Sequence, residues 1–224
     1  NELIGVAATS TEERLTPPVK PEDLAALLDQ MEADGRHDLR LATGLIALFG
    51  LRPAELAVLT VKGDKLYAGA VKRNIATLAQ KAKPPRRCLP LDIAGREGEG
   101  KRLLQLYSSG LVKLPAAVLN EISKVEDKGT FQQVGHAFGQ LLKRYEPWKN
   151  LVRTNEGVTP YSLRHSWAWR CHVCSNNGLH VRQAAALMGH TVAVHLKHYG
   201  SWVDEASLEA AVERYNEGLV AVEQ

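Results

Sequence analysis

Hydrophobic and polar positions follow a helical period over most of the chain. In residues 21–31, apolar side chains recur every three or four positions behind Pro21, which is typical of a first helical turn. A longer apolar run predicts a helix over residues 37–49, and a short helix follows from Pro53, where proline is tolerated. Further helices are predicted near residues 97–110, 115–124, 130–145, 160–176, 180–188 and 203–217.

The pattern changes to a strand-like one only in the region of residues 60–92. Gly63 and Asp64 indicate a turn, residues 65–71 are typical of a strand, and residues 86–92 can pair with it. The expected fold class is therefore mainly α with a small antiparallel β-sheet (α+β). Residues 1–20 are expected to be a linker arm, and residues 21–224 one domain.

Composition narrows the class of protein. The 224 residues are 45% hydrophobic, enough to bury a sizeable core. No stretch approaches the roughly 18 apolar residues of a membrane span, so no membrane partner is expected. Three cysteines, an odd number, argue against a disulfide framework and favour a reducing, cytoplasmic location.

The net charge of +3 is too small to indicate a polyanionic partner by itself. Its distribution is uneven, however, because residues 62–87 carry many basic side chains and the single acid Asp64. The basic residues are Lys62, Lys65, Lys72, Arg73, Lys81, Lys83, Arg86 and Arg87. Such a run is ordinarily a solvated face, and it gains meaning only beside other phosphate-binding groups.

Residues 158–174, VTPYSLRHSWAWRCHVC, raise the question of a buried charge. Thr159 and Pro160 predict a helix start, and Arg164 then shares a stripe with Trp167, Cys171 and Cys174. A zinc site is not expected, because the chain has no second cysteine pair, and the two cysteines are predicted to be core. An arginine on this apolar face needs an anionic partner, either a structural carboxylate or a phosphate.

Two other segments could meet the same anion. Arg52 stands at the start of a helix with Glu55 one turn away to orient it. Gly189 is predicted to end a helix, which places His190 on a turn. Tyr199 follows nine residues later, and such a tyrosine is most often a packing residue with its hydroxyl at the surface. The spacing of His190, His195 and His198 is weak support for a metal site.

Five segments in this order resemble the catalytic domain of the tyrosine recombinase (phage integrase) family: GLRPAEL, KAKPPRRCLPL, YSLRH, LMGH and HYG. The resemblance covers residues 15–217. It implies a site-specific recombinase that cleaves and rejoins double-stranded DNA through a 3′-phosphotyrosyl intermediate, without cofactor or metal. It further implies a homo-tetramer on DNA, a place in bacteria and their mobile elements, and an N-terminal core-binding domain missing upstream of the linker.

The resemblance also implies residue roles. Tyr199 is the nucleophile, Arg52 and Arg164 hold the non-bridging phosphate oxygens, and His190 adds a hydrogen bond. Lys81 protonates the departing 5′-oxygen, with Lys83 and Lys72 as alternatives. The residues expected to contact DNA are Lys72, Arg73, Lys83, Arg86 and Arg87.

One position departs from the family pattern. Tyr161 stands three residues before Arg164, where the family has histidine, and a phenol is a poor proton acceptor at neutral pH. His165 points about 100° away from Arg164 on an ideal helix and is not an automatic substitute. Tyr161 therefore keeps open a weak or inactive DNA-binding member of the same fold. A second alternative, based on the same chemistry, is a DNA-relaxing enzyme resembling the type IB topoisomerases.

Overall fold

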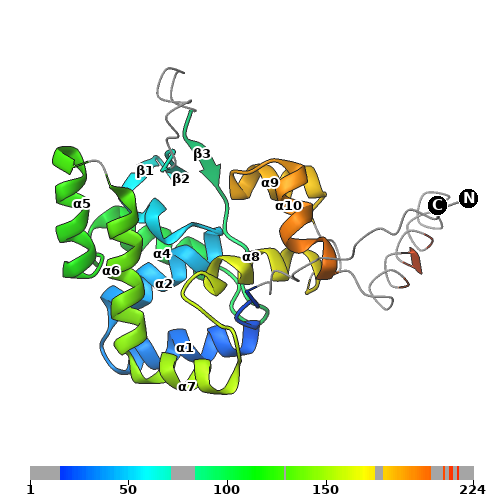
Figure 1. Ribbon diagram of the computed structural model, residues 1–224, viewed down its shortest axis with the longest axis horizontal. Helices are drawn as coiled ribbons and strands as arrows, with labels where there is room; N and C mark the ends of the chain where they lie inside the picture. The colour runs from blue at the N-terminus through cyan, green and yellow to red at the C-terminus, as the bar shows by residue number, and fades with distance from the viewer. Residues whose placement is uncertain are drawn as a thin grey trace, which may run out of the picture.

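The computed structural model describes residues 16–71, 84–128, 130–174 and 179–202, and the single positions 209, 212, 213 and 216. The fold is mostly helical, and one small sheet lies at its edge (Figure 1). The helices are α1 (Pro21–Ala33), α2 (His37–Phe49), α4 (Glu99–Ser109), α5 (Ala116–Lys128), α6 (Phe131–Arg144), α7 (Glu146–Thr154), α8 (Ser162–His172), α9 (Val181–Met188) and α10 (Val192–Tyr199), with short 3-10 helices η1 (Pro53–Val58) and η2 (Gly200–Trp202). The strands are β1 (Leu59–Lys62), β2 (Lys65–Ala68) and β3 (Arg86–Cys88). The predicted fold class is confirmed.

Helix α2 lies at the centre of the fold because its sequence is apolar on every side. All residues from Leu39 to Phe49 are buried, and a helix that is hydrophobic all round needs neighbours on each face. Helices α1, α4 and α8 pack around it (Figure 1). Gly50 then adopts a left-handed conformation with φ of 62° and ends the helix, so the chain turns into the segment of Arg52.

The register of the sheet sets which basic side chains of β3 point toward the core of the protein. Its order is β1-β2-β3, both pairs are antiparallel, and Gly63 with φ of 62° makes the first turn. Arg86 pairs with Ala68, a buried residue of β2. Because paired residues share a face and successive residues alternate, Arg86 points toward the protein and Arg87 points to the other face.

Some elements differ from the sequence-based expectation. Helix α7 was not predicted; its Pro147 occupies the first turn, where the missing N–H is harmless. Strand β1 and helix α10 were also not predicted. The expected helix over residues 203–217 and most of the linker 1–20 lie outside the described residues, apart from a few single positions and residues 16–20. None of the described helices is long and apolar enough to span a membrane.

Helix α8 begins later and ends earlier than the predicted range of residues 160–176. It starts at Ser162, because the Thr159 hydroxyl accepts from the backbone N–H of Tyr161 at 3.3 Å and caps a preceding turn. It ends at His172. Cys171 is buried as predicted, but Cys174 is exposed, so its expected place in the core stripe is wrong. The helix stops before the stripe can extend to it.

Candidate active site

Two buried arginines of α8 bind backbone carbonyls at the end of α2. The last carbonyls of a helix lack partners within the helix and carry partial negative charge. Arg170 donates to the carbonyl of Ala47 at 2.6 Å, and Arg164 donates to the carbonyl of Gly50. A second amino group of Arg164 donates to the carbonyl of Met188, the last residue of α9, at 2.6 Å. Arg164 is thereby fixed between the ends of two helices.

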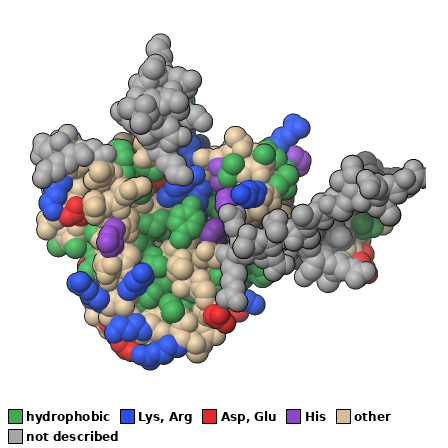
Figure 2. Space-filling model, in the orientation of Figure 1, with side chains coloured by type: hydrophobic (Ala, Val, Ile, Leu, Met, Phe, Trp, Pro, Cys, Tyr) green, Lys and Arg blue, Asp and Glu red, His purple; other side chains and the backbone are tan. Residues whose placement is uncertain are grey.

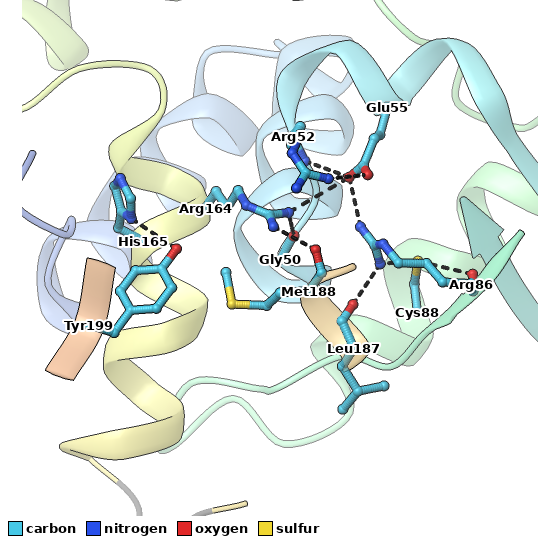
Figure 3. Close-up of polar contacts among 10 residues, drawn as sticks. All are labelled: Gly50, Arg52, Glu55, Arg86, Cys88, Arg164, His165, Leu187, Met188 and Tyr199. Carbon is cyan, nitrogen blue, oxygen red and sulfur yellow. Dashed lines mark hydrogen bonds and ion pairs between the residues drawn. The ribbon is translucent and has the colours of Figure 1, made fainter. Parts of the chain in front are cut away.

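The buried carboxylate of Glu55 joins three arginines from separate segments (Figure 3). Its Oε1 accepts from Nη1 of Arg52 at 2.9 Å, and its Oε2 accepts from Nη2 of Arg86 at 2.7 Å. Nη1 of Arg164 forms an ion pair with Oε2 at 3.8 Å. The prediction that Glu55 orients Arg52 is confirmed. Arg164 has a structural carboxylate as well as two carbonyl partners.

Three guanidinium groups share this one carboxylate, so the cluster keeps an excess of positive charge. Burial lowers the pKa of Arg164, and the charge of Arg52 lowers it further. The side chain of Arg52 is 24% exposed, whereas that of Arg164 is 1% exposed, so solvent reaches the cluster from the Arg52 side. Guanidinium forks match the oxygens of phosphate, and a partly buried excess of charge favours such an anion.

Arg86 lies inside this cluster and not on the outer surface of the sheet, and its role as a DNA contact stays a prediction. Its Nη1 donates to the carbonyl of Leu187 at 2.7 Å and lies 2.8 Å from Sγ of Cys88. The sheet register causes this placement, because Arg86 alternates with Arg87 along β3. Arg87 is the exposed member of the pair.

Tyr199, the last residue of α10, turns its hydroxyl inward. The side chain is buried, and its hydroxyl lies 3.1 Å from Nδ1 of His165 on α8. The alternative of a packing tyrosine with its hydroxyl at the surface is therefore wrong. Figure 3 shows the guanidinium of Arg164 between this Tyr199–His165 pair and the Glu55 cluster.

The electrostatics of the pair favour a neutral phenol and a neutral imidazole. Burial raises the pKa of Tyr199 to about 12, against the opposing charge of Arg164. Burial and then the charge of Arg164 lower the pKa of His165 to about 4. At neutral pH both groups are therefore uncharged, and one proton lies between the phenolic oxygen and Nδ1, on whichever atom the imidazole tautomer dictates.

His190 and Tyr161 lie beside the contact between Tyr199 and His165. Gly189 ends α9 in a left-handed conformation with φ of 70°, as predicted, and His190 follows on the turn. Burial lowers the pKa of His190 to about 3, and the positive charges of Arg164 and Arg52 contribute to this shift. Tyr161 is 40% exposed, and its ring packs edge-on against His165 with 5.1 Å between centroids.

Comparison with known proteins identifies the fold. No family model matches the chain. Excisase A of Nostoc sp. (strain PCC 7120 / SAG 25.82 / UTEX 2576) is 28% identical over 167 residues, which cover 73% of this chain but only 31% of that protein. A crystal structure of XerA recombinase has a similar fold, with a TM-score of 0.54 and 15% identity, covering 91% of this chain and 65% of that one. The chain is therefore similar in sequence to Excisase A and in fold to XerA recombinase.

The expected tyrosine recombinase residues are placed in part. Arg52, Arg164, His190 and Tyr199 come from four separate segments, and the charges of the two arginines act on both of the other side chains. Four basic residues of the same expectation lie outside the described residues: Lys72, Arg73, Lys81 and Lys83. Their roles stay predictions.

His165 is the residue that sequence reasoning set aside. The helical angle between Arg164 and His165 is large, as expected, but α10 packs over the second face and brings Tyr199 to His165. The adjacency of an arginine and a histidine at the start of a buried helix was the available signal. It could not be used without knowing where the late tyrosine lies.

A pocket of about 440 Å³ opens beside Arg52 and Tyr161. Helix α6 lines its other side with polar side chains, namely Gln132, His136, Gln140 and Lys143. Figure 2 shows basic and histidine side chains side by side on the same face, between the strands and helices α9 and α10. In the part of the chain that the structure describes, no group of three or more His, Cys, Asp or Glu side chains could hold a metal ion.

Proposed function

We propose that this domain is the catalytic part of a site-specific recombinase that cleaves and rejoins double-stranded DNA through Tyr199. The phenolic oxygen attacks a backbone phosphorus, a bond from Tyr199 to phosphorus forms, and the bond to the 5′-oxygen breaks. The products are a 3′-phosphotyrosyl ester and a free 5′-hydroxyl. Attack by a 5′-hydroxyl on this ester reverses the step and releases Tyr199, so no energy source is needed.

The arginine cluster carries this proposal. In an in-line displacement, negative charge grows on the non-bridging oxygens, and fixed cations stabilise it without rearranging. Arg164 is held rigidly by Gly50 and Met188, and Arg52 is held by Glu55 at the solvent side. A phosphate that meets Arg52 is then next to Arg164 and close to the hydroxyl of Tyr199.

His165 takes the phenolic proton in this proposal, and Lys81 supplies the proton of the 5′-hydroxyl. Nδ1 of His165 already lies 3.1 Å from the hydroxyl of Tyr199, which is the distance that a general base requires. Its low pKa makes it a weak base in the DNA-free protein. An anionic phosphate between the arginines offsets their field, so it raises the basicity of His165 at the moment when DNA is bound.

A second function is favoured by the protonation state of Tyr199. A buried phenol with a pKa of about 12 is a weak nucleophile. The same geometry would serve a DNA-binding protein that holds a phosphate between arginines without cleaving it. Such a protein would bind DNA with strong salt dependence and form no covalent bond.

Trapping the covalent intermediate distinguishes the two functions. Duplexes of randomised sequence, each nicked close to the position of cleavage, release a short fragment after cleavage and cannot be rejoined. Denatured protein that retains DNA is collected, and the retained sequences are read. The proposal expects covalent DNA with the native chain and none with Tyr199→Phe.

Tyr107→Phe, on α4, is the matched control, since it makes the same chemical change away from the site. An adduct that persists in Tyr199→Phe shows another nucleophile. Salt-dependent binding without any adduct, in this chain and in a longer protein that includes its upstream residues, supports the non-cleaving function. Relaxation of supercoiled plasmid without strand exchange would instead identify a topoisomerase activity.

A further inference from the structure

Three histidines form a continuous hydrogen-bonded chain behind the arginine cluster. Nε2 of His190 lies 2.7 Å from Nδ1 of His195, and Nε2 of His195 lies 2.6 Å from Nε2 of His172. The ring of His195 is 1% exposed and packs edge-on against Tyr199, with 4.7 Å between centroids. The hydrogen-bonded chain runs from His190 at the candidate active site, through the buried ring of His195 on α10, to His172 at the end of α8.

We infer that this chain couples the tautomers of the three rings, so that His195 and His172 act as positioning residues that set which nitrogen of His190 carries its proton. The inference rests on the proposed function for its role at phosphate. The coupling itself does not depend on catalysis.

The number of protons links the two contacts of His195. A neutral imidazole has one N–H and one acceptor nitrogen. His195 uses both of its nitrogens, each against another histidine, and each contact between two nitrogens holds one proton. If His195 donates to His190, it must accept from His172; if it accepts from His190, it must donate to His172. The two contacts therefore reverse together.

All three rings are neutral at physiological pH, as this counting requires. Burial lowers the pKa of His195 to about 4 and that of His190 to about 3, and it also lowers the pKa of His172. For the first two rings, positive neighbours add to the effect of burial. No ring needs to carry a second proton.

The direction of the hydrogen bonds among the three histidines controls whether the free nitrogen of His190 carries a proton. Its Nε2 is occupied by His195, so Nδ1 is the nitrogen that remains for a ligand. In the DNA-free protein, the arginines favour a lone pair on Nδ1, which places the protons of His190 on Nε2, of His195 on Nε2 and of His172 on Nδ1. A phosphate oxygen can only accept, so it requires N–H at Nδ1 of His190 and reverses the whole chain.

This coupling can be tested without DNA. His190→Glu places an acceptor-only group at the active-site end, while His190→Gln places an amide that can still donate to His195. Nitrogen NMR of protein carrying ¹⁵N-labelled histidine reports the tautomer of each ring directly. We expect the proton of His172 on Nδ1 in the native protein and in His190→Gln, and on Nε2 in His190→Glu.

The same tautomer of His172 in all three proteins would overturn the inference. His37→Gln, an exposed position on α2, serves to assign a resonance and leaves His172 unchanged. Backbone amide spectra establish that each variant is folded. The NMR experiment does not measure cleavage. A missing covalent adduct would therefore contradict the proposed function without affecting the test of tautomer coupling.

The role of the three histidines at a DNA phosphate is tested by the rate of adduct formation. His195→Phe removes both contacts, so we expect the rate of adduct formation at saturating DNA to fall about tenfold while the dissociation constant for DNA stays within about twofold. His195→Gln, whose amide can accept from His172 and donate to His190, restores most of the rate. Equal losses in His195→Phe and His195→Gln would show that His195 matters only for packing.

Discussion

The hydroxyl of Tyr199 and Nδ1 of His165 are 3.1 Å apart, in a buried contact between the end of α10 and the start of α8. His165 directly follows Arg164 in the chain, so one helical segment supplies both the group proposed to bind phosphate and the group that contacts the phenol. The contact also places an imidazole nitrogen beside the phenol, although Tyr161 stands where the resemblance to tyrosine recombinases led us to expect histidine.

This relationship predicts how two substitutions differ. His165→Gln keeps a polar side chain but removes the base, so the rate of adduct formation should fall about 10²–10⁴-fold, the usual effect of a general acid–base group. Tyr161→Phe should lower it less than about tenfold, because Tyr161 contacts His165 only through its ring edge. Single-turnover cleavage of the trapped duplexes measures both. A larger loss in Tyr161→Phe would place the base at Tyr161 instead.

The sequence predicted the framework well because its signals are local. The apolar period located most helices, and a glycine with positive φ ended α2 and α9 where the sequence placed the ends. Helix α7 was not predicted. A proline is compatible either with the first turn of a helix or with a break between helices, and the hydrophobic period does not distinguish the two. The order of short motifs then indicated the arginines and the late tyrosine.

The remaining features of the site depend on contacts between distant segments. The inward direction of Arg86 follows from the register of β2 and β3, which the sequence leaves open. The contact of His165 with Tyr199, and the chain through His195, require α10 to pack across α8. An arginine at the start of an apolar helix predicted an anionic partner, but not that Glu55 would be shared among three arginines.

Acid should destabilise the fold in a defined pH range. The folded-state pKa values of His165, His190 and His195 lie at about 3–4, below the ordinary value of 6.5. A lowered pKa contributes stability above the unfolded value of 6.5, and this stability is lost as pH falls toward the folded value. One pKa unit corresponds to about 1.4 kcal/mol, so the free energy of unfolding should fall by several kcal/mol between pH 6.5 and 4.5.

Denaturant unfolding at a series of pH values measures this slope. The carboxylates of Asp29 and Glu32 do not obscure it, because their arginine partners lower their pKa values and they titrate below this range. His195→Gln should make the slope shallower. A free energy of unfolding that stays constant from pH 6.5 to 4.5 would contradict the assignment of these rings as buried and neutral.

Removing the shared carboxylate should make stability depend on added anions. Glu55→Gln leaves Arg52, Arg86 and Arg164 together without their counter-charge, and breaking a buried ion pair in this way costs about 3–5 kcal/mol. Sulfate or phosphate should restore much of the lost thermal stability, since either can occupy the cluster. Glu146→Gln, whose ion pairs with Lys149 and Arg153 are exposed, should change stability by less than about 1 kcal/mol. Equal responses of both variants to sulfate would argue against an anion site.

Arg86 and Arg87 should separate stability from DNA binding although they are neighbours in β3. Arg86→Met breaks the ion pair with Glu55 and the hydrogen bond to Leu187, so it should lower the free energy of unfolding by about 3 kcal/mol. Arg87→Met alters an exposed side chain and should leave stability within about 0.5 kcal/mol. If Arg87 contacts a phosphate, its loss should weaken DNA binding at low salt and reduce the slope of log K against log salt by about one. Arg86→Met should leave that slope unchanged in protein that is still folded, because the charge of Arg86 is paired with Glu55. A slope that is reduced by Arg86→Met and not by Arg87→Met would reverse the two roles. It would show that the register of β3 is different on DNA.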